Sequence, residues 1–300
     1  MGMQRQRNRV TLREVEDEIP PYAILSHTWG RSEDEVTFQD IEAGKHDKAG
    51  FAKIDFTLDR AEQQGISYAW IDTCCINKWN NTELGKAINL MYDWYARSKV
   101  CYVYLSDVPN VSLERSRWFT RGWTLQELVA PTRVEFYDSL GHFLGTREDL
   151  APCIEKATGI PSRALHGHLK DIPIVDRFRW SINRVTKEPE DKSHCVVGLL
   201  GVKMQCAYGL GEPESQYRLF EAVGRKYGVS VADELKQARW NAHQSAPQST
   251  YVPGKLREAL QFEYIESRRD AISHPNYATC SWLLSHPAYL QWLEKQFEFL

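Results

Sequence analysis

The stretch VCYVYLSD, Val100–Asp107, decides the fold class, because six consecutive apolar residues are followed at once by two polar ones. A strand that is apolar at every position is buried on both faces, which is typical of a parallel sheet covered by helices. Three further runs, YAILS, YAWID and VEFY at Tyr22–Ser26, Tyr68–Asp72 and Val134–Tyr137, are nearly continuous in apolar residues. The four runs therefore predict four strands of one sheet.

The segments between these runs repeat their apolar residues with a helical period. Helices are expected over residues 50–65 and over Thr82–Ser98, and a short one carries Trp123 and Glu127. Strands that alternate with helices predict an α/β fold in which right-handed crossovers join the strands. We expect a flavodoxin-like, mostly parallel sheet with helices on both faces and α-helical additions at its C-terminal side.

The period weakens after Leu140, where helices are expected over residues 148–158, 174–181, 191–200 and 217–228. Gln244–Lys255 is rich in Ser, Pro and Gln, which is typical of a linker. The expected divisions are a domain over 1–240 (core about 20–140, helical extension about 141–240), a linker over 241–256 and a helical segment over 257–300.

Composition argues against several classes of protein. The chain has 300 residues, 42% of them hydrophobic, and a formal net charge of −3, so no strong positive field would attract nucleic acid. Its seven cysteines are odd in number and irregularly spaced, which favours a reducing compartment. Met1–Arg9 lacks the apolar core of a signal peptide, and no apolar run is long enough to span a bilayer. We expect a cytoplasmic protein without a nucleic-acid partner or a transmembrane segment.

Polar residues cluster where the predicted strands end, at Ser26–Trp29, Asp72–Cys75 and Ser106–Asp107. In open parallel sheets ligands bind beyond the carboxyl ends of the strands, so these residues are expected to line a pocket. The stretch RGWTLQEL, Arg121–Leu128, sets Trp123 and Glu127 four residues apart, hence on one helix face. An acid beside an indole suits a small active site, although an ordinary surface helix could carry the same pair.

Two other chemistries can be considered for this sequence. Cys74-Cys75 and His27 lie at strand ends and could form a cysteine nucleophile with its base, but adjacent cysteines after an apolar strand are more often buried packing. His166, His168 and His194-Cys195 lack the spacing of structural zinc ligands, so no metal site is expected.

Several long motifs resemble the fungal heterokaryon-incompatibility (HET) domain. Its three signature blocks correspond to YAILSHTWG, WIDTCCINK and SRWFTRGWTLQELVAP, and its later blocks to EDKSHCVVGLLGV and AYGLGEPESQYRLF. The resemblance covers about residues 10–225 and departs from the family pattern at Cys195-Val196 and at Gly209–Glu212. It implies a cell-death effector domain that acts in nonself recognition between fused fungal cells.

Leu260–Leu293 resembles the helical linker that precedes the nucleotide-binding (NACHT) domain of fungal NOD-like receptors. No phosphate-binding loop of the form GxxxxGK[ST] occurs in the chain, so ATP or GTP would bind only to a NACHT domain further along. The resemblance implies the N-terminal part of a longer receptor. Its partners would be the downstream NACHT and repeat domains of the same protein, and it would self-associate through the receptor.

HET domains are also distantly similar to Toll/interleukin-receptor (TIR) domains, whose pattern is a first strand ending near a Ser and a later Trp-Cys-x-x-Glu-Leu helix. YAILS and Trp123–Leu128 correspond to these two parts, with Thr124 in place of Cys. The resemblance implies a TIR-like fold, no permanently bound cofactor, and NAD as the substrate. It also implies that Glu127 is the catalytic residue of an NAD glycohydrolase.

Cleavage of the nicotinamide–ribose bond develops positive charge on the ribose, which one carboxylate can stabilise. The expected NAD-binding residues are Ser26, Thr28 and Asp72 as hydrogen-bonding groups, Trp29 and Trp123 as stacking platforms, and Arg121 at the pyrophosphate. A structural role is open for several of them, since Asp72 could cap a helix, the two tryptophans could pack in the core and Arg121 could pair with an acid.

The alternative function is a non-catalytic, TIR-like signalling or oligomerisation module that triggers death by recruiting partners. Trp79, which lies in a polar loop, would then belong to a contact surface. A third possibility, compatible with both, is that residues 1–240 act as a regulatory cap on the downstream nucleotide-binding domain.

Overall fold

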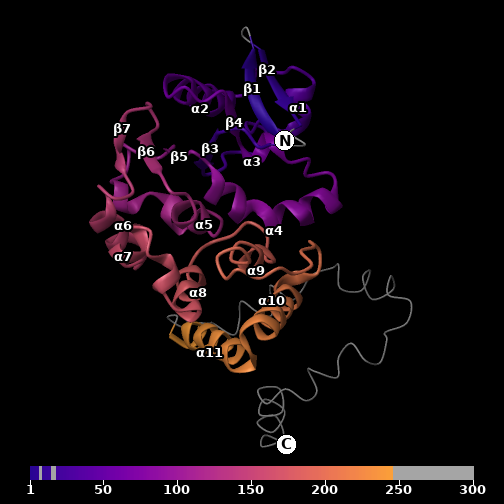
Figure 1. Cartoon of the computed structure of the whole chain (residues 1–300), viewed down its shortest axis with the longest axis vertical. Coiled ribbons are helices and arrows are strands. Elements are labelled where there is room, and N and C mark those ends of the chain that lie inside the picture. Colours follow the sequence, from indigo (N-terminus) through magenta and orange to yellow (C-terminus); the bar gives the residue numbers. More distant parts are fainter. Residues whose placement is uncertain (7–8, 15–17, 246–300) are drawn as a thin grey trace, which may run out of the picture. The chain divides into compact units, whose positions relative to one another are not determined.

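The fold is α/β and is built on one seven-stranded sheet (Figure 1). The computed structural model describes residues 1–6, 9–14 and 18–245. The strands are β1 (Gly2–Gln6), β2 (Arg9–Arg13), β3 (Tyr22–His27), β4 (Tyr68–Trp70), β5 (Val100–Leu105), β6 (Val134–Asp138) and β7 (Phe143–Thr146), in the order β2-β1-β4-β3-β5-β6-β7. The central four strands, β4-β3-β5-β6, are parallel and follow the flavodoxin-like order of a doubly wound sheet.

The four apolar runs are confirmed as the four central strands, whereas the three outer strands were not predicted. β1 and β2 form an antiparallel hairpin beside β4, and β7 pairs antiparallel with β6. These outer strands bury only a few side chains, such as Met3 and Val10 in the hairpin. GMQRQ and RVTLR therefore lack the continuous apolar run that identifies a central strand. YAWID is also shorter as a strand than expected, because Asp72 begins helix α3.

The described helices are α1 (Phe38–Glu42), α2 (Phe51–Gln63), α3 (Asp72–Cys75), α4 (Asn81–Arg97), α5 (Thr124–Val129), α6 (Ala151–Thr158), α7 (Ser162–Leu165), α8 (Ile174–Ile182), α9 (Asp191–His194), α10 (Gly211–Tyr227) and α11 (Val229–Ser245). Short 3-10 turns occur at Leu113–Arg115, Arg117–Thr120 and Leu169–Asp171. The helices over residues 50–65 and Thr82–Ser98 are confirmed as α2 and α4, and the Asn80 side chain caps α4 by accepting from two backbone amides.

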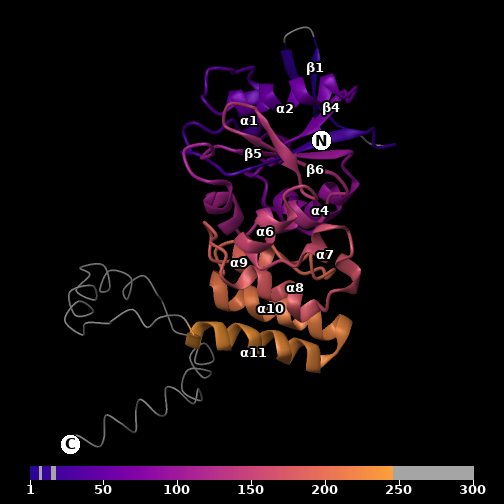
Figure 2. The ribbon, with the colours of Figure 1, turned by 90° about the vertical axis from the view of Figure 1, so that its left-hand side faces the viewer.

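Helices cover both faces of the sheet, as predicted (Figures 1 and 2). On one face, Phe56 of α2 packs against Tyr104 and Tyr137, with ring centroids 5.2 and 5.1 Å apart. On the other face, Trp70 of β4 contacts Trp94 of α4 at 5.2 Å. Because side chains alternate along a strand, Ser26 points to the α4–α5 side and His27 to the α2 side.

The helical extension packs beyond α4 and α5 and has its own core around Phe178, Val223 and Leu235 (Figure 2). The helix expected over residues 191–200 is wrong in length, since only Asp191–His194 is helical and turns follow. Gly201, with φ of +63°, ends this turn region in a left-handed conformation that suits glycine.

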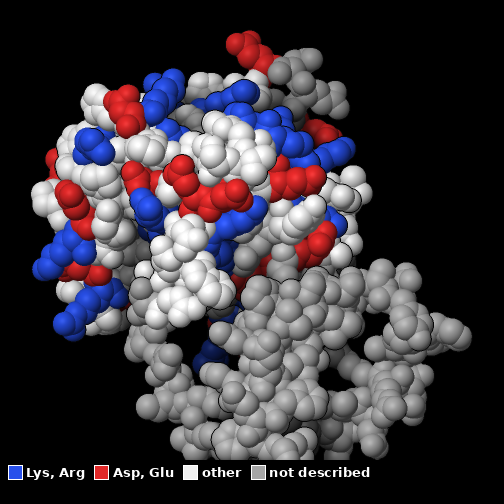
Figure 3. Space-filling view, turned by 90° about the horizontal axis from the view of Figure 1, so that it is seen from below, with Lys and Arg blue, Asp and Glu red and all other residues white. Residues whose placement is uncertain are grey.

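Helix α11 continues to Ser245 and so occupies the first five residues of the predicted linker. The rest of that linker and the helical segment predicted for 257–300 lie outside the described residues. No helix within the described ranges is both long and apolar enough to cross a membrane. On the described part of the face drawn in Figure 3, basic and acidic side chains are interspersed.

Candidate functional site

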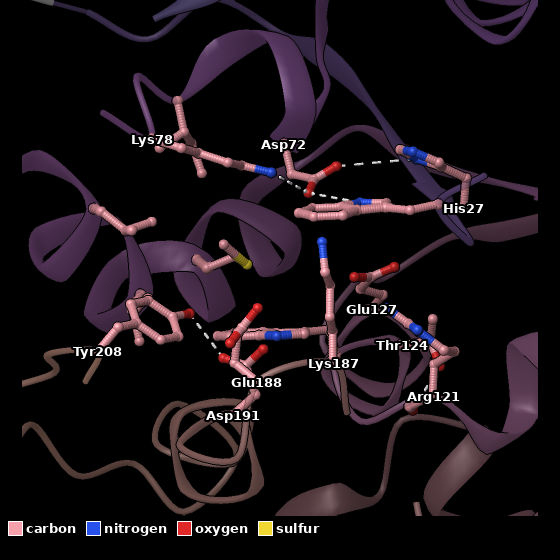
Figure 4. A pocket seen from close by; sticks show the side chains of 16 residues that line it. His27, Asp72, Lys78, Arg121, Thr124, Glu127, Lys187, Glu188, Asp191 and Tyr208 are labelled. Atoms are coloured by element: carbon pink, nitrogen blue, oxygen red, sulfur yellow. Dashed lines mark hydrogen bonds and ion pairs between the residues drawn. The ribbon is translucent and has the colours of Figure 1, made fainter. Parts of the chain in front are cut away.

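A cavity of about 290 Å³ lies at the carboxyl ends of β3 and β4, beside helix α5. Five of the seven predicted site residues line it: Trp29, Asp72, Arg121, Trp123 and Glu127. The cavity is where the parallel topology places ligands. Figure 4 shows that the labelled residues reach it from the strand ends, from the helix that carries Glu127 and from the helical extension.

Glu127 is held in place by a buried hydrogen-bond relay. The Ser26 hydroxyl donates to the Glu127 carboxyl, and the Trp118 indole N–H donates to the Ser26 oxygen at 2.8 Å. Ser26 and Trp118 are fully buried, and the side chain of Ser26 lies behind the carboxyl, outside the cavity lining. Ser26 therefore positions Glu127. The sequence suggested that Ser26 would bind the ligand directly, but its side chain is not part of the cavity lining.

Burial changes the charge state of Glu127. Only 7% of the residue is exposed, and burial raises the pKa of its carboxyl to about 8, with the nearby Asp72 acting in the same direction. The Ser26 hydrogen bond and the Arg121 charge oppose this rise. The Glu127 carboxyl is therefore mostly protonated at neutral pH, and a cation beside it would favour its ionised form.

Asp72 organises the opposite wall of the cavity. Its carboxylate accepts the indole N–H of Trp29 at 3.2 Å and lies 3.3 Å from the Lys78 ammonium. The same ammonium lies 3.7 Å from the centroid of the Trp29 ring, a cation–π contact. Burial opposes ionisation of Asp72, but Lys78 and His27 lower its pKa overall. One wall thus carries an ionised acid while Glu127 carries a proton.

His27 also lines the cavity, as expected for a member of the polar cluster Ser26–Trp29. Its Nδ1 lies 4.0 Å from Asp72 Oδ1, and its Nε2 lies 3.7 Å from Glu35 Oε2, which is too long for a hydrogen bond. Burial and the Lys53 charge lower the pKa of His27, so the ring is neutral near pH 7. Glu35 is bonded to Lys53 at 2.6 Å, and although burial opposes ionisation, His27 and Lys53 lower its pKa to about 2.

The remaining predicted residues are not part of the cavity lining. Thr28 is buried and its hydroxyl lies 3.3 Å from that of Ser106. Cys74 and Cys75 are buried beneath the wall, and the Cys74 thiol donates to the Val36 carbonyl at 3.3 Å. Burial raises the pKa of the Cys75 thiol to about 12 and also raises that of Cys74. The burial and raised pKa of both thiols argue against a thiolate near neutral pH and favour the packing interpretation of these cysteines.

The helical extension supplies lining residues that were not predicted, namely Lys187, Glu188, Asp191 and Tyr208 (Figure 4). The Tyr208 hydroxyl donates to Asp191 at 2.7 Å. These residues lie more than fifty positions after the RGWTLQEL motif. Asp191 and Tyr208 belong to the later HET-like blocks, EDKSHCVVGLLGV and AYGLGEPESQYRLF, but the sequence did not indicate that they would reach the site.

Gly122 explains how this distant segment reaches the site. The Gly122 amide donates to the Val185 carbonyl at 2.9 Å, so the backbones lie side by side. A Cβ at position 122 would lie 2.6 Å from the Thr186 methyl group, so any other residue here would force its surroundings to shift. The Arg184 guanidinium adds a bond to the Arg121 carbonyl at 2.8 Å. The glycine of the motif therefore brings Lys187 and its neighbours to the cavity.

The fold and the cavity together define a class of protein: an α/β domain whose strand-end site is completed by a helical extension. Residues 22–112 match the family described as Heterokaryon incompatibility protein (HET). The chain is also 43% identical over 224 residues to Vegetative incompatibility protein HET-E-1 of Podospora anserina. This alignment covers 70% of the chain and 16% of that protein.

The resemblance to HET domains seen in the sequence motifs is therefore confirmed. No solved structure matches the chain. The similarity to TIR domains stays a prediction.

Proposed function

We propose that this domain is the death effector of a fungal nonself-recognition protein and that it hydrolyses NAD at the nicotinamide–ribose bond when copies assemble. The name of its relative supports the incompatibility role, and the relative is a much longer protein, of which the aligned region covers 16%. The NACHT and repeat domains implied by the sequence resemblance would supply recognition and assembly.

The observation that carries the enzymatic proposal is the buried Glu127 carboxyl at a cavity that Trp29, Trp123 and Asp72 also line. The nicotinamide ring of NAD carries a positive charge, and a cation beside Glu127 favours its ionised form. Substrate binding would thus release the Glu127 proton and create the carboxylate inside the site. The two indoles suit stacking against the planar ring.

In the proposed step, the C1′–N bond of the ribose breaks and its electron pair neutralises the nicotinamide nitrogen. The positive charge that develops on the ribose is stabilised by the Glu127 carboxylate. The oxygen of a water molecule then bonds to C1′, and Glu127 takes the proton that this water loses. Because nicotinamide leaves as a neutral molecule, no general acid is needed, and the single Glu127 carboxylate can suffice.

The test is nicotinamide release by the oligomerised domain, which can be prepared as a fusion to a self-assembling scaffold. Wild type is compared with Glu127→Gln and with Glu234→Gln, a matched change at an exposed residue of α11 far from the cavity lining. We expect Glu127→Gln to lower the rate by at least about a hundredfold, the usual range for loss of a charge-stabilising group. Equal rates for Glu127→Gln and wild type would rule out the catalytic role.

A second candidate function is favoured by one exposed aromatic residue. Trp79, just before the N-cap of α4, is 82% exposed, and a large apolar side chain in water is typical of a contact surface. A non-catalytic module that kills by partner recruitment would keep cellular NAD level during death. Under this candidate, Trp79→Ala would abolish killing and Glu127→Gln would remain toxic.

A further inference from the structure

A second cavity of about 350 Å³ adjoins the first. The two cavities share five lining residues, which are Trp29, Ile76, Lys78, Arg121 and Lys187. Three of the five are cationic, so the boundary between the cavities carries a concentration of positive charge. The second cavity adds Arg31 on the same side of the site.

Two of the boundary cations form no ion pair within the described ranges, although the Arg121 charge acts on the nearby Glu127. Within the described ranges, the ammonium of Lys187 and the guanidinium of Arg121 take part in no hydrogen bond or ion pair. Figure 4 shows that the Lys187 side chain extends into the first cavity. Lys78 differs, because it already pairs with Asp72 at 3.3 Å. Unpaired cations at the wall of a cavity provide the charge that a phosphate group needs.

The second cavity also offers aromatic surface for a base. Its lining includes Phe38, and it includes Trp79, whose indole is 82% exposed. The acid in this lining, Glu35, is already neutralised by Lys53 and by the Gly30 amide, both at 2.6 Å. The lining of the second cavity therefore combines unneutralised basic groups with aromatic rings, which is typical of nucleotide subsites.

We infer that the two cavities form one site for a dinucleotide, with the diphosphate at Lys187 and Arg121 and the distal nucleoside in the second cavity. This inference rests on the proposed function for the identity of the reacting half, which occupies the first cavity. The diphosphate of a dinucleotide carries two negative charges. One guanidinium can bind it in a bidentate manner, and one ammonium can pair with the second charge. A nicotinamide mononucleotide would fill only the first cavity and would leave the boundary cations partly unpaired.

The probe for the distal subsite is ADP, which contains the diphosphate and the adenosine but no nicotinamide bond to cleave. Titration calorimetry on the full chain would measure ADP binding to wild type, Lys187→Gln and Arg121→Gln. The matched control is Lys203→Gln, because Lys203 is exposed and lines neither of the two cavities. Lys187 is exposed as well, so its substitution should leave folding intact, which thermal denaturation verifies.

We expect ADP to bind wild type and Lys203→Gln equally, and Lys187→Gln and Arg121→Gln roughly tenfold more weakly, the effect of one charge-assisted hydrogen bond. Absence of ADP binding, or equal binding to all four proteins, would overturn the inference. If ADP binds as expected while NAD is not cleaved, the distal subsite stands and the proposed function fails. If nicotinamide mononucleotide and NAD are cleaved equally well and ADP does not compete, the proposed function stands and the dinucleotide subsite fails.

Discussion

The substitution Glu127→Gln should make the protein more stable at alkaline pH, because the buried carboxyl disfavours folding once it ionises. Its pKa is raised from 4.5 to about 8 in the folded protein, chiefly by burial. Glutamine keeps an oxygen that can accept the hydrogen bond from the Ser26 hydroxyl, but its side chain cannot ionise. The variant therefore preserves the hydrogen bond and removes the charge.

The sign and size follow from linkage between protonation and folding. The folded state holds the Glu127 proton up to about pH 8, whereas the unfolded state releases it near pH 4.5. The stabilising contribution of the protonated carboxyl is thus fully present below pH 4.5 and is lost as the pH rises through 8. A shift from 4.5 to about 8 corresponds to a loss of about 5 kcal/mol.

The assay is urea unfolding of wild type, Glu127→Gln and the control Glu234→Gln at pH 5, 7 and 9. The free energy of unfolding of Glu127→Gln should exceed that of wild type by several kcal/mol more at pH 9 than at pH 5. The difference between Glu234→Gln and wild type should stay constant. A Glu127→Gln difference that is also constant across this range would refute the argument that Glu127 is buried and protonated.

Three further outcomes follow from particular contacts. In chemical denaturation, Gly122→Ala should lower the free energy of unfolding by about 1–3 kcal/mol through overpacking. The control is Gly224→Ala inside α10, where the added Cβ would meet only Ala232, at 3.7 Å; this change should be neutral or stabilising by up to about 1 kcal/mol. Ser26→Ala removes a hydrogen bond that lowers the Glu127 pKa, so the pH midpoint of nicotinamide release should move upward; an unchanged midpoint would contradict the relay. Of the six cysteines within the described ranges, Cys153 is the one that is not buried, and a thiol reagent should modify it first in the native protein and reach the others only after denaturation, as mass spectrometry of the labelled peptides would show.

Local sequence determined most of the central architecture of this protein. Continuous apolar runs such as Val100–Leu105 identify buried parallel strands, because every side chain of such a strand meets a covering helix. The rule for open sheets then placed Trp29, Asp72 and Glu127 at one end of the sheet, and the structure brings all three to one cavity. Both inferences need only the period of the neighbouring residues and the direction of the strands.

Tertiary structure alone decided which side chains face the cavity and what charge they carry. Ser26 lies behind Glu127 because strand β3 meets helix α5, whereas Lys187 reaches the cavity through the packing of the helical extension against Gly122. The proton on Glu127 likewise arises from burial, which is the sum of contacts with residues far away in the chain. A sequence shows which groups can ionise or bind, but their environment exists only after distant segments have met.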